Sequence, residues 1–346
     1  MKKILIICTL GPEFDESCLN KVGVGGSETW VVQLADAFAR KGNDVSVLCK
    51  CQTHYAQNGV KYISLNDINF YVHFNKFDLC IVSREYGNMI QALDAIQCAE
   101  NIYIQAHDVQ IFGDNFNFIK DLPHFRGIST LSAFQERSIH EKNGVDWKYF
   151  VRIGNGIDPT LFEGRDFTPT NKRLLHSSCY YRGGDIMKEH VVPEYVKVMN
   201  DAGCDYCTYD ALNVVDDKHN KLLGSLSKDA LYSQMANRYC WFYPLNVDET
   251  FCITMIENIM CENDIIMPFN YGPSSVLEPF VRDITMKHDF LSGEEEFKLA
   301  TEEAVARIVK SINQYDRGAE LRNEMKDYVL QNYTWDRVAD KWLKLV

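Results

Sequence analysis

The sequence lacks any apolar run long enough to cross a membrane. Apolar stretches such as Ile4–Cys8 and Val45–Cys49 have the length of β-strands, whereas a transmembrane helix needs about 20 apolar residues. The basic and then apolar start, Met1–Cys8, is similar to a weak signal peptide, but it is short and has no small-residue cleavage site. We therefore expect a first strand there, no transmembrane segment, and a cytoplasmic protein with at most a peripheral association with membranes.

An excess of basic residues and a framework of paired cysteines are also missing. The net charge is −12, whereas a nucleic-acid-binding protein would show a basic surface. The twelve cysteines are scattered, and without a secretory signal we interpret them as reduced, buried thiols. One C-x2-C pair exists, Cys204 and Cys207, but no second pair completes a metal site. The sequence thus predicts neither a nucleic-acid partner nor a bound metal.

Internal repeats, low-complexity segments and the dinucleotide-binding pattern G-x-G-x-x-G are absent as well. The composition that remains is typical of a soluble globular enzyme, with 46% hydrophobic and 24% charged residues. A length of 346 residues is enough for two domains with separate cores.

The first half of the chain alternates between apolar strands and helical stretches. This order predicts an α/β fold with a parallel sheet that helices cover on both faces. The clearest helix is Ser27–Lys41, with Ser27 as the expected N-cap and Gly42 as the C-terminal stop. The expected strands are Lys3–Cys8, Asp44–Cys49, Val60–Ile63, Phe77–Val82 and Asn101–Gln105.

A second α/β series begins near Lys172, after a segment rich in turn residues between Asn155 and Thr170. We expect the domain boundary in that segment. Two α/β domains that face each other would place ligands at the carboxyl ends of their strands. The expected elements of the second series are strands Arg173–Ser178, Tyr239–Tyr243 and Asp264–Met267 and helix Asp229–Asn237.

Two glutamates eight positions apart, Glu249 and Glu257, are the most informative feature of the chain. Glu249 follows a proline-containing loop. Glu257 lies in an apolar run with helical spacing that starts near Cys252. Carboxylates accept hydrogen bonds from sugar hydroxyls, and the free amides of a helix N-terminus attract phosphate. This segment therefore predicts a site that holds a sugar, a ribose and a diphosphate together.

The same segment resembles the E-x7-E motif of retaining glycosyltransferases of family 4, which have the GT-B fold. The family pattern runs approximately P-x4-E-x-F-G-x4-E-A, and Phe251 and both glutamates fit it. Cys252 stands in place of the usual glycine and Asn258 in place of the usual alanine.

Further motifs follow in the family's order along the chain. Gly25-Gly26 resembles the family's glycine loop, and the step His107-Asp108 resembles the one that follows a central strand of the first domain. Arg182-Gly183 matches the family's Lys-Gly step. The earlier arginine of that motif is replaced by Ser177, and Lys188 has a different spacing, so one expected positive charge is missing.

The resemblance implies two Rossmann-like domains that face a cleft, with a C-terminal helix that returns to the first domain. We expect an acceptor-side domain over residues 1–155, a nucleotide-sugar-binding domain over 156–328 and the returning helix over 329–346. No D-x-D triplet occurs, although the GT-A glycosyltransferases typically hold their metal with one. The resemblance therefore implies metal-independent transfer with no cofactor.

The implied reaction moves a sugar from a UDP- or GDP-linked donor to an acceptor hydroxyl, with retention, on a glycan, lipid-linked or protein acceptor. Arg182 would contact the phosphates, Glu257 the ribose and Glu249 the sugar hydroxyls, while His107 would line the sugar pocket. The other implied donor-binding residues are Gly25, Gly26, Gly183, Thr250, Phe251, Cys252 and Ile253. Acceptor contacts are expected from the loops 11–21 and 112–124.

Two alternatives stay open at the level of sequence. One is a GT-B sugar epimerase or phosphorylase. The other is a non-catalytic subunit that binds sugar nucleotides, which the missing positive charge at Ser177 favours.

Overall fold

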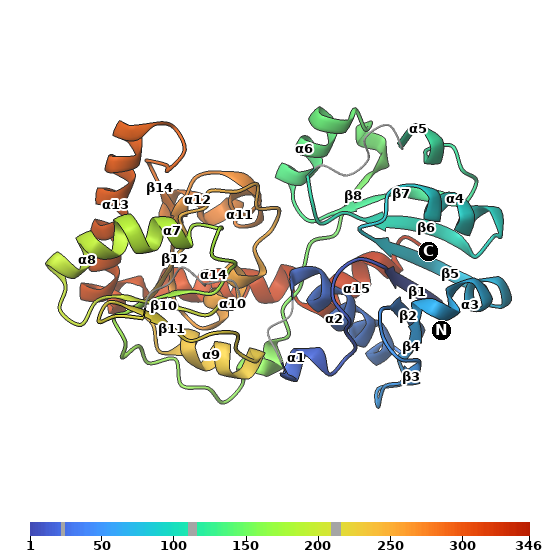
Figure 1. Ribbon diagram of the computed structural model, residues 1–346, viewed down its shortest axis with the longest axis horizontal. Coiled ribbons are helices and arrows are strands. Elements are labelled where there is room, and N and C mark those ends of the chain that lie inside the picture. Colours follow the sequence, from blue (N-terminus) through green and yellow to red (C-terminus); the bar gives the residue numbers. More distant parts are fainter. Residues whose placement is uncertain (22–24, 110–115, 209–215) are drawn as a thin grey trace. The chain divides into compact units, whose positions relative to one another are not determined.

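A computed structural model describes residues 1–21, 25–109, 116–208 and 216–346. The chain divides into two compact units (Figure 1). The first contains most of residues 1–156 together with Tyr333–Val346, and the second contains Ile157–Asn332. The predicted boundary after residue 155 lies next to this division. Helix α14 continues to Asn332, and the last segment of the first unit begins at Tyr333, four positions after the start of the predicted terminal segment.

The first unit is built on an eight-stranded sheet with the order β3-β4-β2-β1-β5-β6-β7-β8. All pairs are parallel except β3 with β4. The first two predicted strands are observed with the predicted bounds, and the other three differ by one or two residues at one or both ends. The strands are β1 (Lys3–Cys8), β2 (Asp44–Cys49), β3 (His54–Tyr55), β4 (Lys61–Ser64), β5 (Phe77–Ser83), β6 (Ala99–Gln105), β7 (Phe125–Thr130) and β8 (Phe150–Arg152).

Both faces of this sheet are buried because apolar residues occupy successive positions of the central strands. In β1, Ile4 and Ile6 face one core and Leu5 and Ile7 face the other. Helices α2 and α15 cover the first face, and α3, α4 and α6 cover the second. The helices of this unit are α1 (Cys18–Lys21), α2 (Gly26–Arg40), α3 (Ile68–Phe74), α4 (Asn88–Ala95), α5 (Phe116–Ile119), α6 (Ala133–Asn143) and α15 (Trp335–Leu343).

The start of α2 corrects one prediction. The helix begins at Gly26 with Gly25 at the N-cap, and no side chain caps it. The predicted N-cap, Ser27, instead donates its hydroxyl to Glu28 Oε2 at 3.1 Å. The predicted stop is confirmed, since Gly42 has a φ of +79° just after the helix.

The C-terminal helix α15 belongs to the first unit. Its Trp342 is fully buried and makes edge contacts with Trp30 of α2 and Tyr103 of β6. Lys341 donates to the backbone oxygen of Ile153 at 2.9 Å. Deleting a buried tryptophan side chain costs about 3–5 kcal/mol, so α15 is an integral part of this core.

The second unit contains two three-stranded parallel sheets, β11-β10-β9 and β12-β13-β14. An isolated parallel bridge between Asn171 and Arg238 links their inner edges. Residues of both sheets share one hydrophobic core. The strands are β9 (Leu174–His176), β10 (Cys204–Tyr206), β11 (Asn220–Leu222), β12 (Cys240–Phe242), β13 (Asp264–Pro268) and β14 (Thr285–Met286).

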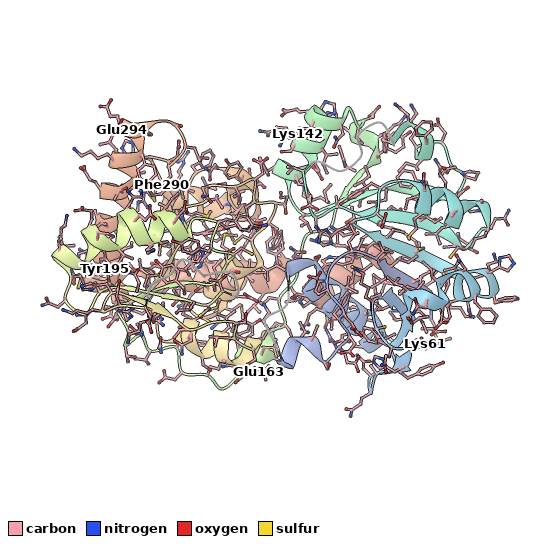
Figure 2. All side chains as sticks on the ribbon, viewed as in Figure 1. Lys61, Lys142, Glu163, Tyr195, Phe290 and Glu294 are labelled. Carbon is pink, nitrogen blue, oxygen red and sulfur yellow. The ribbon has the colours of Figure 1, made fainter. Side chains whose placement is uncertain are left out.

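Helices α8 and α13 pack on one face of this core. Tyr195 of α8, labelled in Figure 2, is fully buried there, and its hydroxyl donates to the backbone oxygen of Lys172 at 2.7 Å. The helices of the unit are α7 (Gly184–Ile186), α8 (Val192–Val198), α9 (Lys228–Ala236), α10 (Ile253–Met260), α11 (Tyr271–Val276), α12 (Val281–Ile284), α13 (Glu294–Asn313) and α14 (Ala319–Asn332).

Candidate functional site

The two glutamates lie where the sequence predicts them. Strand β12 ends at Phe242, and the following loop carries Glu249. Helix α10 starts at Ile253 and carries Glu257 in its second turn. The carboxyl ends of parallel strands are the usual place of ligand sites in α/β domains, and this segment follows the carboxyl end of β12.

Glu249 is fixed at both carboxylate oxygens. Its Oε2 lies 2.9 Å from Arg182 Nη1. Its Oε1 accepts hydrogen bonds from the amides of Thr250 at 3.0 Å and Phe251 at 3.4 Å. The structure thus brings four predicted site residues together. Burial alone would lower the pKa of Arg182, but the Glu249 carboxylate and two tyrosines outweigh it, so the net pKa is raised.

Glycine is required next to Arg182 for steric reasons. Gly183 has a φ of +87°, and a Cβ there would come within 2.4 Å of Pro244 Cγ. The loop after β9 therefore packs directly on the loop after β12. The amide of Gly272, in the first turn of helix α11 after β13, donates to the Glu249 backbone oxygen at 2.8 Å. Segments that follow three neighbouring strands thus hold Arg182 and Glu249 in place.

Cys252, the residue that replaces the family's glycine, has left-handed backbone angles of φ 70° and ψ 82°. Glycine adopts this conformation without strain, whereas other residues lose about 1–2 kcal/mol. The fold therefore explains why a glycine is suited to this position. Burial raises the pKa of the Cys252 thiol, so the thiol stays protonated and is a poor nucleophile.

Glu257 has two partners that sequence reasoning missed. Its Oε1 accepts hydrogen bonds from Lys228 Nζ at 2.5 Å and from the Tyr232 hydroxyl at 2.9 Å. Only 2% of Glu257 is exposed. Both donors lie on α9, four positions apart, which places them on one face of that helix. This i, i+4 spacing is the signal that could have drawn attention to them.

Ser177, at the position of the missing arginine, directly follows β9. Its Oγ is buried and makes no hydrogen bond to the described residues. Lys188 lies on the turn Met187–Val191, which has π-helical geometry, and is partly exposed.

The first unit places the other predicted residues at the carboxyl ends of its strands. Gly25 precedes α2, and the Glu28 carboxylate fills the space beside it. A Cβ at Gly25 or at Gly11 would come within 2.3 or 2.4 Å of that carboxylate. The two glycines therefore leave room for the buried Glu28 carboxylate.

His107 follows β6 and lies against Trp30, with ring centroids 5.5 Å apart. Its Nε2 is 3.2 Å from Ser83 Oγ. Burial, with a smaller effect from the charge of Arg84, lowers the pKa of His107 to about 3. The imidazole is therefore neutral near pH 7. Its neighbour Asp108 is exposed and lies 3.4 Å from Arg84 Nε.

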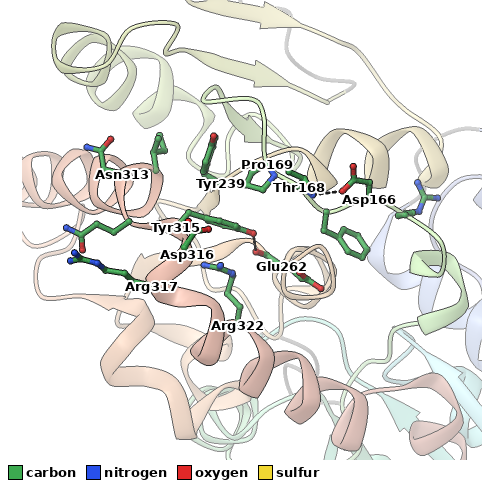
Figure 3. A pocket seen from close by; sticks show the side chains of 14 residues that line it. Asp166, Thr168, Pro169, Tyr239, Glu262, Asn313, Tyr315, Asp316, Arg317 and Arg322 are labelled. Atoms are coloured by element: carbon green, nitrogen blue, oxygen red, sulfur yellow. Dashed lines mark hydrogen bonds between the residues drawn. The ribbon is translucent and has the colours of Figure 1, made fainter.

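A cavity of about 810 Å³ lies elsewhere in the second unit (Figure 3). The linker residues Arg165–Pro169, the end of α13 and the start of α14 form its wall. Its most buried charge, Arg322, is bonded to Asp264 at 2.7 Å and lies 3.6 Å from the centre of the Tyr315 ring. None of the predicted site residues lines this cavity.

One group in the described part of the chain has the composition of a metal site. Ligand atoms of Asp15, Glu16 and His54 lie within 4.8 Å of one another in the first unit. His54 Nε2 is already 2.8 Å from Glu16 Oε2, and its Nδ1 is 2.8 Å from the Gln52 backbone oxygen. The group includes no predicted donor-site residue. Of the expected acceptor loops, residues 112–115 and the side chains of Asn20 and Lys21 lie outside the described residues.

Several solved structures share this architecture over their whole length. HepE of Anabaena, crystallised with UDP and glucose, is 14% identical, with a TM-score of 0.70 over 100% of this chain and 99% of that one. The chain has the GT-B fold.

Two further GT-B structures match equally well. A glycosyltransferase from Rickettsia africae is 12% identical, with a TM-score of 0.70 over 99% of this chain and 97% of that one. Sucrose-phosphate synthase from Thermosynechococcus elongatus is 11% identical, with a TM-score of 0.71 over 100% and 98%. No protein-family model and no curated protein matches the chain by sequence.

The predicted α/β fold is therefore confirmed. Among the helices that the structure describes, none combines the length and hydrophobicity that a membrane crossing requires.

Proposed function

We propose that this chain is a retaining glycosyltransferase of family 4 that transfers a sugar from a nucleotide diphosphate sugar to an acceptor hydroxyl. The observation that carries the proposal is the group Arg182, Glu249 and Glu257, which lies on segments that follow the carboxyl ends of strands in the second unit. It contains one cation for a diphosphate and two carboxylates for hydroxyl groups. That HepE binds UDP and UDP-glucose in the same fold supports a nucleotide-sugar donor.

Arg182 is the proposed phosphate ligand. Its Nη1 is bonded to Glu249 and its Nε contacts the Tyr181 hydroxyl at 3.5 Å. No residue in the described ranges is bonded to its Nη2, which is left to donate to a phosphate oxygen. A charge-assisted bond of this kind stabilises the diphosphate as negative charge develops on the leaving group.

Glu249 is the proposed ligand of the transferred sugar. The Arg182 ion pair and the two backbone amides hold the carboxylate in one orientation. With Oε1 occupied by the two amides and one lone pair of Oε2 by Arg182, the second lone pair of Oε2 can accept from a sugar hydroxyl. A preorganised contact of this type lowers the barrier by orienting the substrate.

Glu257 is the proposed ribose ligand, with Gly25, Gly26, Gly183, Thr250, Phe251, Cys252 and Ile253 as further donor-binding residues. For His107 we propose a contact with the transferred sugar. A neutral imidazole, as the lowered pKa implies, can exchange hydrogen bonds with a hydroxyl but cannot serve as a strong acid.

The proposed transfer uses neither a bound metal nor a covalent intermediate. The charge of the leaving group would be stabilised by Arg182 and by backbone amides. We assign the role of a nucleophile neither to Glu249, which accepts three hydrogen bonds, nor to Glu257, whose proposed ligand is the ribose. Retention rests on the resemblance to family 4.

A thermal-shift panel of UDP- and GDP-sugars, followed by a turnover assay, tests the proposal. A binding donor should raise the melting temperature by mass action and should release nucleotide diphosphate when an acceptor is present. Stabilisation without any turnover would identify a sugar-nucleotide-binding subunit instead. Release of an altered free sugar without an acceptor would identify an epimerase, and pyridoxal absorbance of the purified protein a phosphorylase.

A further inference from the structure

Lys228 and Tyr232 form a two-point clamp on Glu257. Ser227 caps helix α9, with its hydroxyl accepting from the Ala230 amide at 3.3 Å. Because Lys228 and Tyr232 are four positions apart, their side chains lie on one face of α9. Both reach the same oxygen of the Glu257 carboxylate on α10. The bond from Lys228 is short, at 2.5 Å, and the bond from Tyr232 has an ordinary length of 2.9 Å.

The clamp saturates one oxygen of the carboxylate and leaves the other open. A carboxylate oxygen has two lone pairs, and Oε1 uses both for Lys228 and Tyr232. Within the described residues, no hydrogen bond reaches Oε2. A side chain that is 2% exposed and held at Oε1 can present only Oε2 to a ligand.

The clamp itself is rigid. Tyr232 is 3% exposed and packs on Phe162, with ring centroids 4.6 Å apart. Burial and the charge of Glu257 both raise the pKa of the Tyr232 hydroxyl, so it remains a donor. Lys228 Nζ, whose side chain is 18% exposed, provides the cation that compensates the buried charge.

We infer that Lys228 is a positioning residue that, with Tyr232, aims Glu257 Oε2 at the ribose hydroxyls and so sets a preference for ribonucleotides over deoxyribonucleotides. This rests on the proposed function, in which Glu257 binds the ribose. Two vicinal hydroxyls match the two lone pairs of one fixed oxygen. A freely rotating carboxylate would discriminate less, because it could satisfy a single hydroxyl in several orientations.

The test is calorimetry of UDP and GDP and of their 2′-deoxy counterparts with the wild type, Lys228→Met and Lys228→Arg. We expect the wild type to prefer its ribonucleotide by roughly tenfold, the equivalent of one hydrogen bond. Lys228→Met should lower that ratio to about twofold or less, and Lys228→Arg should restore most of it. The matched control is Lys326→Met, which removes a lysine paired with Glu262 at 2.6 Å in the same unit and should keep the wild-type ratio.

The outcomes separate the inference from the proposed function. If the wild type bound neither ribonucleotide, the proposed function would fail. If it bound ribo and deoxy forms equally, the ribose role of Glu257 would fail. If the wild type discriminated and Lys228→Met weakened both forms equally with the ratio unchanged, the ribose role would stand and the clamp would be wrong. If Lys228→Met does not fold, the comparison of Tyr232→Phe with the wild type decides by the same ratio.

Discussion

Arg182 and Glu249 are 67 positions apart in the sequence, yet their side chains form an ion pair with Nη1 and Oε2 2.9 Å apart. The pair joins the loop after β9 to the loop after β12, and backbone amides hold the other oxygen of Glu249. A cation and a carboxylate with separate proposed ligands, the diphosphate and the sugar, thus belong to one preorganised unit. Replacing Arg182 should therefore weaken binding of the diphosphate, whereas replacing Glu249 should slow transfer of the sugar.

Replacing Glu257 should weaken nucleotide binding. Its proposed hydrogen bonds to the ribose are charge-assisted and worth about 1.5–3 kcal/mol, so Glu257→Ala should lower the affinity for nucleotide diphosphate roughly ten- to a hundredfold. Calorimetry measures this directly, and circular dichroism checks that the variant is folded. An unchanged affinity would rule out the ribose role.

Substitutions at Cys252 should reverse the usual order of glycine and alanine. Because φ is 70° at this position, Cys252→Gly should be more stable than Cys252→Ala by about 1 kcal/mol, although alanine is normally preferred. Urea unfolding of the two variants gives the difference. A more stable alanine variant would show that the left-handed backbone is not maintained in solution.

His107 should make the stability of the protein depend on pH. Its folded pKa of about 3 lies below the ordinary value of 6.5, so the unfolded chain binds a proton that the folded chain excludes. The resulting stability is fully present above pH 6.5 and is lost as the pH falls towards 3. Between pH 7 and pH 5, the free energy of unfolding, measured by urea titration, should fall by about 1–2 kcal/mol more in the wild type than in His107→Asn. The exposed histidine variant His73→Asn serves as the control and should follow the wild type; equal losses in all three proteins would contradict the lowered pKa.

Transfer should persist in excess chelator. The proposed site stabilises the leaving group with Arg182 and backbone amides, and the resemblance implies no metal on the diphosphate. Turnover with EDTA should match turnover without it, with added manganese giving no gain. Loss of activity in EDTA and its recovery with manganese would overturn metal independence. In that case, repeating the assay with His54→Gln would show whether the group Asp15, Glu16 and His54 holds the ion.

The sequence predicted the helices and strands that depend on local patterns of apolar and turn residues. Apolar runs with flanking turns located β1 and β2 without error, and the helical spacing after Cys252 located α10. The prediction of Ser27 as the N-cap is wrong because its hydroxyl donates to Glu28. The same hydroxyl lies 3.4 Å from Nη1 of Arg84, a residue far away in the sequence. Local propensity cannot anticipate such competition.

The partners within the site could not be read from the sequence, because tertiary packing creates them. Lys228 lies 29 positions before Glu257 and precedes the predicted helix by one residue. The left-handed backbone at Cys252 depends on how the preceding loop enters helix α10, which the local sequence does not determine. The resemblance to family 4 named the two glutamates, whereas the structure shows what each one is bonded to.

The most direct test of the proposed function compares Glu249→Ala with Arg182→Ala in a paired experiment, with nucleotide diphosphate affinity from calorimetry and turnover of the donor identified by thermal shift. Glu249→Ala should keep nearly full nucleotide affinity but lose turnover by roughly a hundredfold or more, because a contact that positions the sugar is lost. Arg182→Ala should weaken nucleotide binding itself, because it removes the charge that faces the diphosphate. If both folded variants turned over the donor at the wild-type rate, the assignment of this site to glycosyl transfer would be contradicted.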